Sequence, residues 1–180
     1  MELAFSGGRP VLDLLGTLSD RGSAEVEQLR TWRDVESWVQ AAGVHVDDLS
    51  GDDADLDRVR ALREALYGVV TAGLTGAAAA EADRRTVNDA AAAAVLTPQL
   101  TGPGEVRWTG GLAGLLGTVA RDGLDLLASP DLRMLRECAD AHCSRLFVDR
   151  SRGGRRRWCG MKGCGDRAKA AAYRRRHRPS

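Results

Sequence analysis

Apolar residues recur every third or fourth position through most of the first 129 residues, which is the spacing of helices that bury one face. The pattern predicts a helix over residues 31–42, with Thr31 and Asp34 as a capping pair, and a longer helix over residues 54–74. Their apolar stripes are Trp32, Val35, Trp38, Val39 and Ala42 in the first helix and Leu56, Val59, Leu62, Leu66, Val69 and Val70 in the second.

Glycine and proline divide this region into elements. Gly43 should end the first helix, and Gly73 and Gly76 the second. Residues 77–94 are rich in alanine, so we expect a third helix that packs closely on a neighbour. Residues 99–108 have the two short arms and the Gly-Pro-Gly turn of a β-hairpin, and leucines at helical spacing predict a last helix over residues 111–128.

The apolar run Val11–Leu18 is too short for periodicity to distinguish a helix from a strand. Pro10 directly before it favours a helix, because proline suits the first helical turn. Asp13 lies inside this run. We interpret it as a local cap or salt-bridged residue, with a pocket-lining carboxylate as the alternative.

The pattern changes after Ser129-Pro130, where we place a domain boundary. Residues 145–149 alternate like a strand and are expected to pair with residues 135–138. A helix is expected from Gly165 onward, with Asp166 as its N-cap.

All four cysteines of the chain lie beyond this boundary, as Cys138-x4-Cys143 and Cys159-x4-Cys164. The first residues have neither the basic nor the apolar region of a secretory signal, so we expect a cytoplasmic protein in a reducing compartment. Clustered cysteines there favour a structural zinc site, and four thiolates would leave no open position for catalysis. Disulfides and unrelated buried thiols are the alternatives.

His142 and His177 are substitute metal ligands that four cysteines make unnecessary. Phe147 and Trp158 are interpreted as the small core over the metal, with base stacking as the alternative role. A hairpin that supplies one cysteine pair and a helix start that supplies the other would form a treble-clef-like arrangement.

The predicted fold is therefore mainly α (α+β). A helical N-terminal domain with a small β-hairpin occupies residues 1–129, and a treble-clef-like zinc finger with four cysteine ligands occupies residues 130–180.

A net charge of +1 conceals a strong asymmetry along the chain. Residues 131–180 have 15 Lys and Arg against 5 Asp and Glu, whereas residues 1–130 have 11 against 20. A basic module beside an acidic body indicates a polyanionic partner, and a solvated charged face is the alternative. On the last helix Arg167, Arg174 and Arg178 share one face. The candidate nucleic-acid-binding residues are Arg152, Arg155, Arg156, Arg157, Lys162, Arg167, Lys169, Arg174, Arg175 and Arg176.

Residues 156–169, R-R-W-C-G-M-x2-C-G-D-R-x-K, and the upstream F-x-D-x-S-R of residues 147–152 resemble the CGNR zinc-finger family. The segments G-G-R-P-V-L-D-L-L-G-T and L-R-T-W-R-D-V-E-S-W-V-Q-A-A-G resemble the ABATE domain that precedes this finger. The family is regarded as stress-induced transcription regulators of bacteria with the finger as the DNA-binding part. The resemblance implies zinc at Cys138, Cys143, Cys159 and Cys164.

The chain departs from the family pattern at two positions. Asp166 replaces the asparagine of the name motif; an aspartate there would repel a phosphate but would cap a helix equally well. Gly16 stands where the family tends to have asparagine.

We therefore expect a DNA-binding transcription regulator that is not an enzyme, with zinc as its cofactor. The helical domain is expected to serve dimerisation, as a homodimer, or the sensing of a small-molecule effector. DNA is favoured over RNA. The alternatives are an RNA-binding or ribosome-associated zinc protein and a protein-interaction adaptor. No apolar run approaches the roughly 20 residues of a membrane span, so no membrane partner is expected.

Overall fold

The computed structural model describes residue 3, residues 5–21 and residues 24–177. Its helices and strand pairs are α1 (Pro10–Leu15), β1 (Leu18–Ser19) with β2 (Val26–Glu27), α2 (Trp32–Ala41), α3 (Asp53–Thr75), α4 (Glu81–Ala92), β3 (Thr97–Gly102) with β4 (Glu105–Thr109), α5 (Gly111–Ala128), α6 (Asp131–Met134), β5 (Leu135–Glu137) with β6 (Leu146–Val148), the π-helical turn η1 (Met161–Gly165) and α7 (Asp166–Arg176). Each strand pair is antiparallel. The predicted mainly helical fold with small strand pairs is confirmed.

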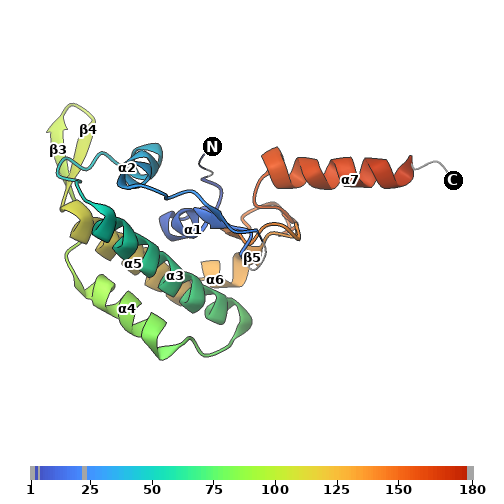
Figure 1. Ribbon diagram of the computed structural model, residues 1–180, viewed down its shortest axis with the longest axis horizontal. Coiled ribbons are helices and arrows are strands. Elements are labelled where there is room, and N and C mark those ends of the chain that lie inside the picture. The colour runs from blue at the N-terminus through green and yellow to red at the C-terminus, as the bar shows by residue number, and fades with distance from the viewer. Residues whose placement is uncertain (1–2, 4, 22–23, 178–180) are drawn as a thin grey trace.

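Helices α3, α4 and α5 pack against one another, and α1 packs on α3 and α5. Figure 1 shows this body, with the β3–β4 hairpin at one end and α7 projecting from the other. We refer to the part from α1 to α5 as the body and to residues 135–177 as the finger. No helix in the described part of the chain has the length and apolar character needed to cross a membrane.

The helices predicted at residues 31–42, 54–74 and 111–128 are present, as is the hairpin. The capping pair of α2 also forms, since the Asp34 carboxylate accepts the Thr31 backbone N–H at 2.8 Å. Ala42 is exposed, so it does not belong to the buried face of α2. Gly73 lies inside α3, and only Gly76, with a left-handed φ of 74°, ends that helix.

The alanine-rich segment behaves differently from its prediction. Residues 77–80 are not helical and α4 begins at Glu81, because the chain must reverse between two packed helices before a new helix can start. Glycines in the neighbouring helices provide the close contact expected from the alanines. A Cβ atom on Gly68 would clash with Asp83 Oδ2, and one on Gly117 would clash with the Ala94 carbonyl oxygen.

The finger shares the core of the body through β5 and β6. Leu146 and Val148 of β6 and Leu135 of β5 join the buried cluster formed by the body helices, whereas Phe147 belongs to the separate cluster around the cysteines. Alternate residues of a strand point to opposite faces, so β6 supplies one side chain to the finger core and two to the body core. The predicted pairing of these two strands is confirmed.

Backbone hydrogen bonds and ion pairs reinforce this joint between the body and the finger. The Val148 N–H donates to the Gly7 carbonyl at 2.9 Å. The Arg9 guanidinium contacts the carboxylates of Asp122 on α5, at 2.7 Å, and of Asp131 on α6, at 3.1 Å. Asp131 also pairs with Arg150 of the finger at 2.7 Å. The N-terminal loop, α5, α6 and the finger are thereby held in one arrangement.

A buried ion pair fixes the β1–β2 hairpin to α3. Arg63 is 2% exposed and donates to both Glu27 oxygens at 2.7 and 2.6 Å and to Thr17 Oγ1 at 3.1 Å. Burial disfavours the charged form of Glu27, but Arg63, together with the Leu29 N–H and Arg60, outweighs this effect and holds the pKa of that carboxyl below its usual range.

We expect the substitution Arg63→Ala to lower the free energy of unfolding by about 3–5 kcal/mol, because it leaves Glu27 and Thr17 without their buried donor. Arg85→Ala removes an exposed ion pair with Glu81 and should cost at most about 0.5 kcal/mol. Urea denaturation followed by circular dichroism measures both. The difference between wild type and Arg63→Ala should shrink as the pH falls through the lowered pKa of Glu27, since protonation removes the pair. Equal losses for the two variants would contradict this assignment.

Candidate metal centre and nucleic-acid interface

The four cysteines come together in one buried cluster. Cys138 follows β5, Cys143 precedes β6, Cys159 lies in the loop after the arginine run and Cys164 lies in η1. Their sulfur atoms all lie within 4.8 Å of one another, and the Sγ of Cys159 is 3.7 Å from that of Cys143 and 3.6 Å from that of Cys164. Tetrahedral zinc–thiolate bonds of about 2.3 Å place the sulfurs about 3.8 Å apart. The four thiols are free and suit a metal ion.

The chemistry of the cluster also suits a cation. A hydrogen bond with Cys159, together with burial, raises the pKa of Cys143, and burial raises the pKa of Cys164 to about 12. Four thiolates in so small a volume would repel one another, whereas a divalent ion stabilises the charged form of each. Cys138, Cys143, Cys159 and Cys164 would hold such an ion.

Neither histidine considered as a substitute ligand joins the cluster. His142 is exposed, and His177 stacks on Tyr173 with ring centres 4.1 Å apart. The four cysteines are the only potential metal-binding group found among the described residues.

Phe147 and Trp158 form the apolar cover of the cysteines, as predicted. Phe147 is fully buried, whereas Trp158 is partly buried. The Arg156 guanidinium lies over the Phe147 ring, 4.2 Å from its centre. The Cys159 N–H donates to Cys138 Sγ at 3.4 Å, which orients one sulfur of the cluster.

Asp149 organises the loop that presents the arginine run. Its buried carboxylate accepts the backbone N–H groups of Ser151 at 2.9 Å and Arg156 at 3.0 Å, and these hydrogen bonds, led by those from Ser151, hold its pKa below the usual range. Gly153 and Gly154 have φ values of 83° and 61°, so the turn between them needs glycine. Sequence analysis missed this role of Asp149, although aspartate side chains commonly accept the backbone N–H two residues further on in a turn.

Arg156 has a different environment from the other arginines of the run. It donates to the carbonyls of Ser6 and Trp158 at 2.9 Å each, and to that of Cys159. These contacts connect the metal-binding loop to the N-terminal segment. Its guanidinium is therefore occupied by the protein itself.

The remaining basic candidates differ in the partners that their side chains have. Arg167 donates to Asp140 Oδ2 at 2.9 Å and to Cys164 Sγ at 3.1 Å, so it faces the cysteine cluster. Lys169 lies 3.9 Å from the Asp166 carboxylate, and Lys162 is exposed on η1. Of the basic candidates that the structure describes, six exposed arginines have no ion pair with a described carboxylate: Arg152, Arg155, Arg157, Arg174, Arg175 and Arg176. Arg178 lies outside the described residues.

The arginines of the body show the opposite behaviour, since many of them are neutralised by carboxylates. Arg9, Arg21, Arg60, Arg63 and Arg107 each form an ion pair. The surplus positive charge of the second half therefore lies on the loop of residues 152–157 and on α7. No residue of α7 is buried, and its charged residues are accessible.

The prediction that Asp166 is the N-cap of α7 is wrong. Gly165 is the N-cap, and Asp166 is the first helical residue with an exposed side chain. The reason is that η1 runs directly into α7, so the backbone is already helical at Gly165 (φ −64°, ψ −42°). The Asp166 carboxylate in the first turn still favours the helix dipole.

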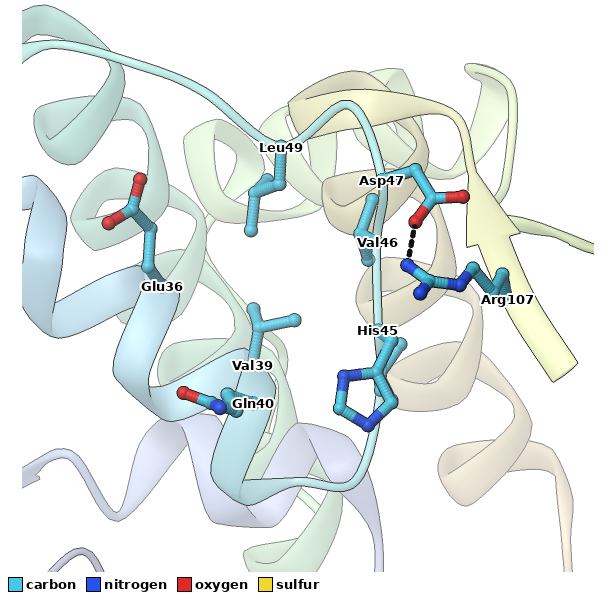
Figure 2. Close-up of a pocket in the computed structure, with 9 residues that line it drawn as sticks. Glu36, Val39, Gln40, His45, Val46, Asp47, Leu49 and Arg107 are labelled. Atoms are coloured by element: carbon cyan, nitrogen blue, oxygen red, sulfur yellow. Dashed lines mark hydrogen bonds and ion pairs between the residues drawn. The ribbon is translucent and has the colours of Figure 1, made fainter. Parts of the chain in front are cut away.

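The body has a hollow of about 360 Å³ between α2 and the segment of residues 44–49 (Figure 2). In Figure 2, Val39 and Leu49 point toward one another across it, and the Arg107 guanidinium is paired with Asp47 at 2.7 Å. Trp108 of β4 holds the segment in place, since it exchanges backbone hydrogen bonds with His45 (2.8 Å) and with the Asp47 N–H (3.0 Å). Asp13, the other candidate for a pocket, instead caps the N-terminal loop by accepting the Gly7 N–H at 2.8 Å.

We expect the purified protein to contain one zinc ion per chain and Cys143→Ala to lose it, because three thiolates cannot complete the tetrahedral site. His142→Ala, at the adjacent exposed position, should keep the full zinc content. Elemental analysis of dialysed protein gives the stoichiometry, and a thermal melt with and without chelator gives the effect on stability. Loss of zinc from His142→Ala, or its retention in Cys143→Ala, would contradict the ligand set.

Arg156→Ala should lower the free energy of unfolding by about 2–3 kcal/mol, because it removes hydrogen bonds from a charged donor to three carbonyls. Arg155→Ala, one position earlier and exposed, should change it by less than about 0.5 kcal/mol. Chemical denaturation of the zinc-loaded proteins measures the difference. An Arg156→Ala variant as stable as Arg155→Ala would show that the joint does not depend on this residue.

Comparison with known protein families covers both parts of the chain. The model of the family ABATE, described as "Putative stress-induced transcription regulator", matches residues 8–130. The model of the CGNR zinc finger matches residues 134–177, which include the four cysteines. No curated protein matches the chain. The resemblance expected from the sequence is confirmed, and the chain belongs to the ABATE family, with a CGNR zinc finger following the ABATE region.

Proposed function

We propose that the protein is a zinc-dependent, DNA-binding transcription regulator of the bacterial cytoplasm. The observation that carries the proposal is the distribution of uncompensated charge. Six exposed arginines on the loop of residues 152–157 and on α7 have no carboxylate partners among the described residues, whereas the arginines of the body are largely paired. Phosphates of a nucleic acid would supply the missing counter-charge.

The shape of α7 favours DNA over RNA. The helix projects from the rest of the molecule (Figure 1), with no buried residue along its length and with Arg174, Arg175 and Arg176 in its last turns. A free α-helix fits the major groove of B-form DNA, about 12 Å wide, whereas the major groove of an RNA duplex is too deep and narrow for side chains to read. In this proposal the loop of residues 152–157 binds phosphates and α7 enters the groove.

Zinc has a structural role in this proposal. Four thiolates would close the coordination shell, so the site has no position for a substrate and no catalytic role is assigned to the ion. The ion would connect the end of β5, the start of β6, the arginine loop and η1. It would thereby hold the loop of residues 152–157 in a fixed orientation relative to α7.

We assign effector sensing or homodimerisation to the body. The hollow beside α2 has an apolar centre and a polar rim of Glu36, Gln40 and His45, which suits a small molecule with apolar and polar parts. Because β6 belongs to both the body core and the finger, a ligand that shifts the body helices would also shift the residues around the metal centre.

We expect the triple variant Arg152→Ala, Arg155→Ala and Arg157→Ala to bind duplex DNA weakly. Each phosphate contact contributes about 0.9 to the slope of log affinity against log salt, so the variant should lose about 2–3 from that slope. A body triple, Arg33→Ala, Arg84→Ala and Arg85→Ala, removes the same charge from α2 and α4 and should leave the slope unchanged. Fluorescence anisotropy across a salt series measures both.

The same assay tests the other candidate functions. Tighter binding to RNA than to duplex DNA in competition would replace the proposal with an RNA-binding role. Absence of binding to either nucleic acid at low salt would point to a protein-interaction adaptor.

A further inference from the structure

The arginine loop of the finger borders an open hollow of about 600 Å³, separate from the hollow of the body. Its lining residues are Ser151, Arg152, Arg155, Arg156, Arg157, Trp158, Gly160 and Met161. None of these described residues carries a carboxylate. The hollow is therefore both concave and positively charged, which a surface made only to contact a duplex backbone does not need to be.

The hollow also has apolar residues among its lining. Met161 is 51% exposed although it is a large apolar residue, and Trp158 is only partly buried. Exposed apolar side chains inside a charged hollow mark a contact with a ligand that has an apolar part. A phosphate by itself would leave the exposed Met161 side chain without an apolar partner.

These residues are held in place before any ligand binds. Trp158 packs on the cysteine cluster, and the Arg157 guanidinium lies over its ring, 5.3 Å from the centre. The Arg155 N–H donates to Ser151 Oγ at 3.2 Å, in the turn organised by Asp149. Met161 lies next to Gly165, where a Cβ atom would be only 2.9 Å from the Met161 sulfur.

We propose that this hollow binds one unstacked nucleotide of a DNA strand. Its base would lie against Met161, at the edge of Trp158, and its phosphates would be bound by Arg152, Arg155 and Arg157. A base presents an apolar π-face and a phosphate presents negative charge, so together they match the two kinds of lining residue. This inference rests on the proposed function and adds that an unpaired or extruded base is part of the bound state.

A continuous duplex cannot place the π-face of a base in the hollow. Its bases remain stacked inside the helix, so their edges and the phosphate backbone are accessible from outside but their π-faces are not. A site with an extruded or unpaired base offers the π-face at no additional cost of unstacking. We therefore expect the protein to discriminate between DNA with and without such a base.

Three 20-base-pair DNAs of one sequence test this proposal: a fully paired duplex, the same duplex with one unpaired nucleotide at its centre, and the same bulge with an abasic site in place of that nucleotide. The zinc-loaded full chain should bind the bulge with a base about tenfold more tightly than either of the others, as expected for one stacked base. The abasic bulge separates stacking from altered backbone shape, because it keeps the phosphates.

Met161→Ala should reduce this preference to near unity while leaving the affinity for paired duplex unchanged, and Met161→Leu should retain it. Arg174→Ala on α7 is the matched control; it should weaken binding to all three DNAs by the same factor. Zinc content confirms that each variant is folded. 2-Aminopurine at the unpaired position should change its fluorescence on binding to wild type and not on binding to Met161→Ala.

Equal affinity for the three DNAs, or a preference that Met161→Ala leaves intact, would overturn the proposed nucleotide site while the duplex-binding function stands. If neither the paired nor the bulged DNA binds at low salt, the proposed function itself fails, and the nucleotide site fails with it.

Discussion

Burial of β6 on both faces is the constraint on which the arrangement of the molecule depends. Leu146 and Val148 pack into the core of the helical body, and Phe147 packs on the cysteine cluster. Because residues in a strand alternate between faces, neither core can move without moving the other. The metal ion that the cysteines suit would stabilise not only the finger but also the surface to which the body helices attach.

Polar contacts surround the buried β6 residues at the joint between the body and the finger. The Arg9 guanidinium forms ion pairs with the carboxylates of Asp122 and Asp131, and Asp131 also forms an ion pair with Arg150 of the finger. Arg156 adds a second connection, from the metal-binding loop to the carbonyl of Ser6. Such networks fix orientation by charge and hydrogen-bond geometry. The body and the finger are consequently positioned relative to each other, which is a requirement for any signal that passes from one to the other.

The arginines of the finger have separate roles although they are close in sequence. Arg156 is used for packing and hydrogen bonds, and Arg167 is used against Asp140 and Cys164. Arg152, Arg155 and Arg157 remain exposed without carboxylate partners beside a hollow that contains Trp158 and Met161. Arginines close together in sequence therefore have two roles: some stabilise the finger from inside, and others give its surface a positive charge. The direction of each side chain decides which role it has.

Local features of the sequence were sufficient for the long helices α2, α3 and α5, for the β3–β4 hairpin and for the grouping of the four cysteines. Helical periodicity depends on residues three and four apart, and both the spacing of the cysteines and the concentration of basic residues can be read along the chain. The start of α4, the N-cap of α7, the role of Arg156 and the Arg9 network could not be found in this way. Each depends on groups that come together only on folding, such as Arg9 and Asp122, which are 113 residues apart. The sequence determined which chemistry the protein has, and the tertiary structure decided which charges remain available to a partner, because only packing shows which of them are already neutralised.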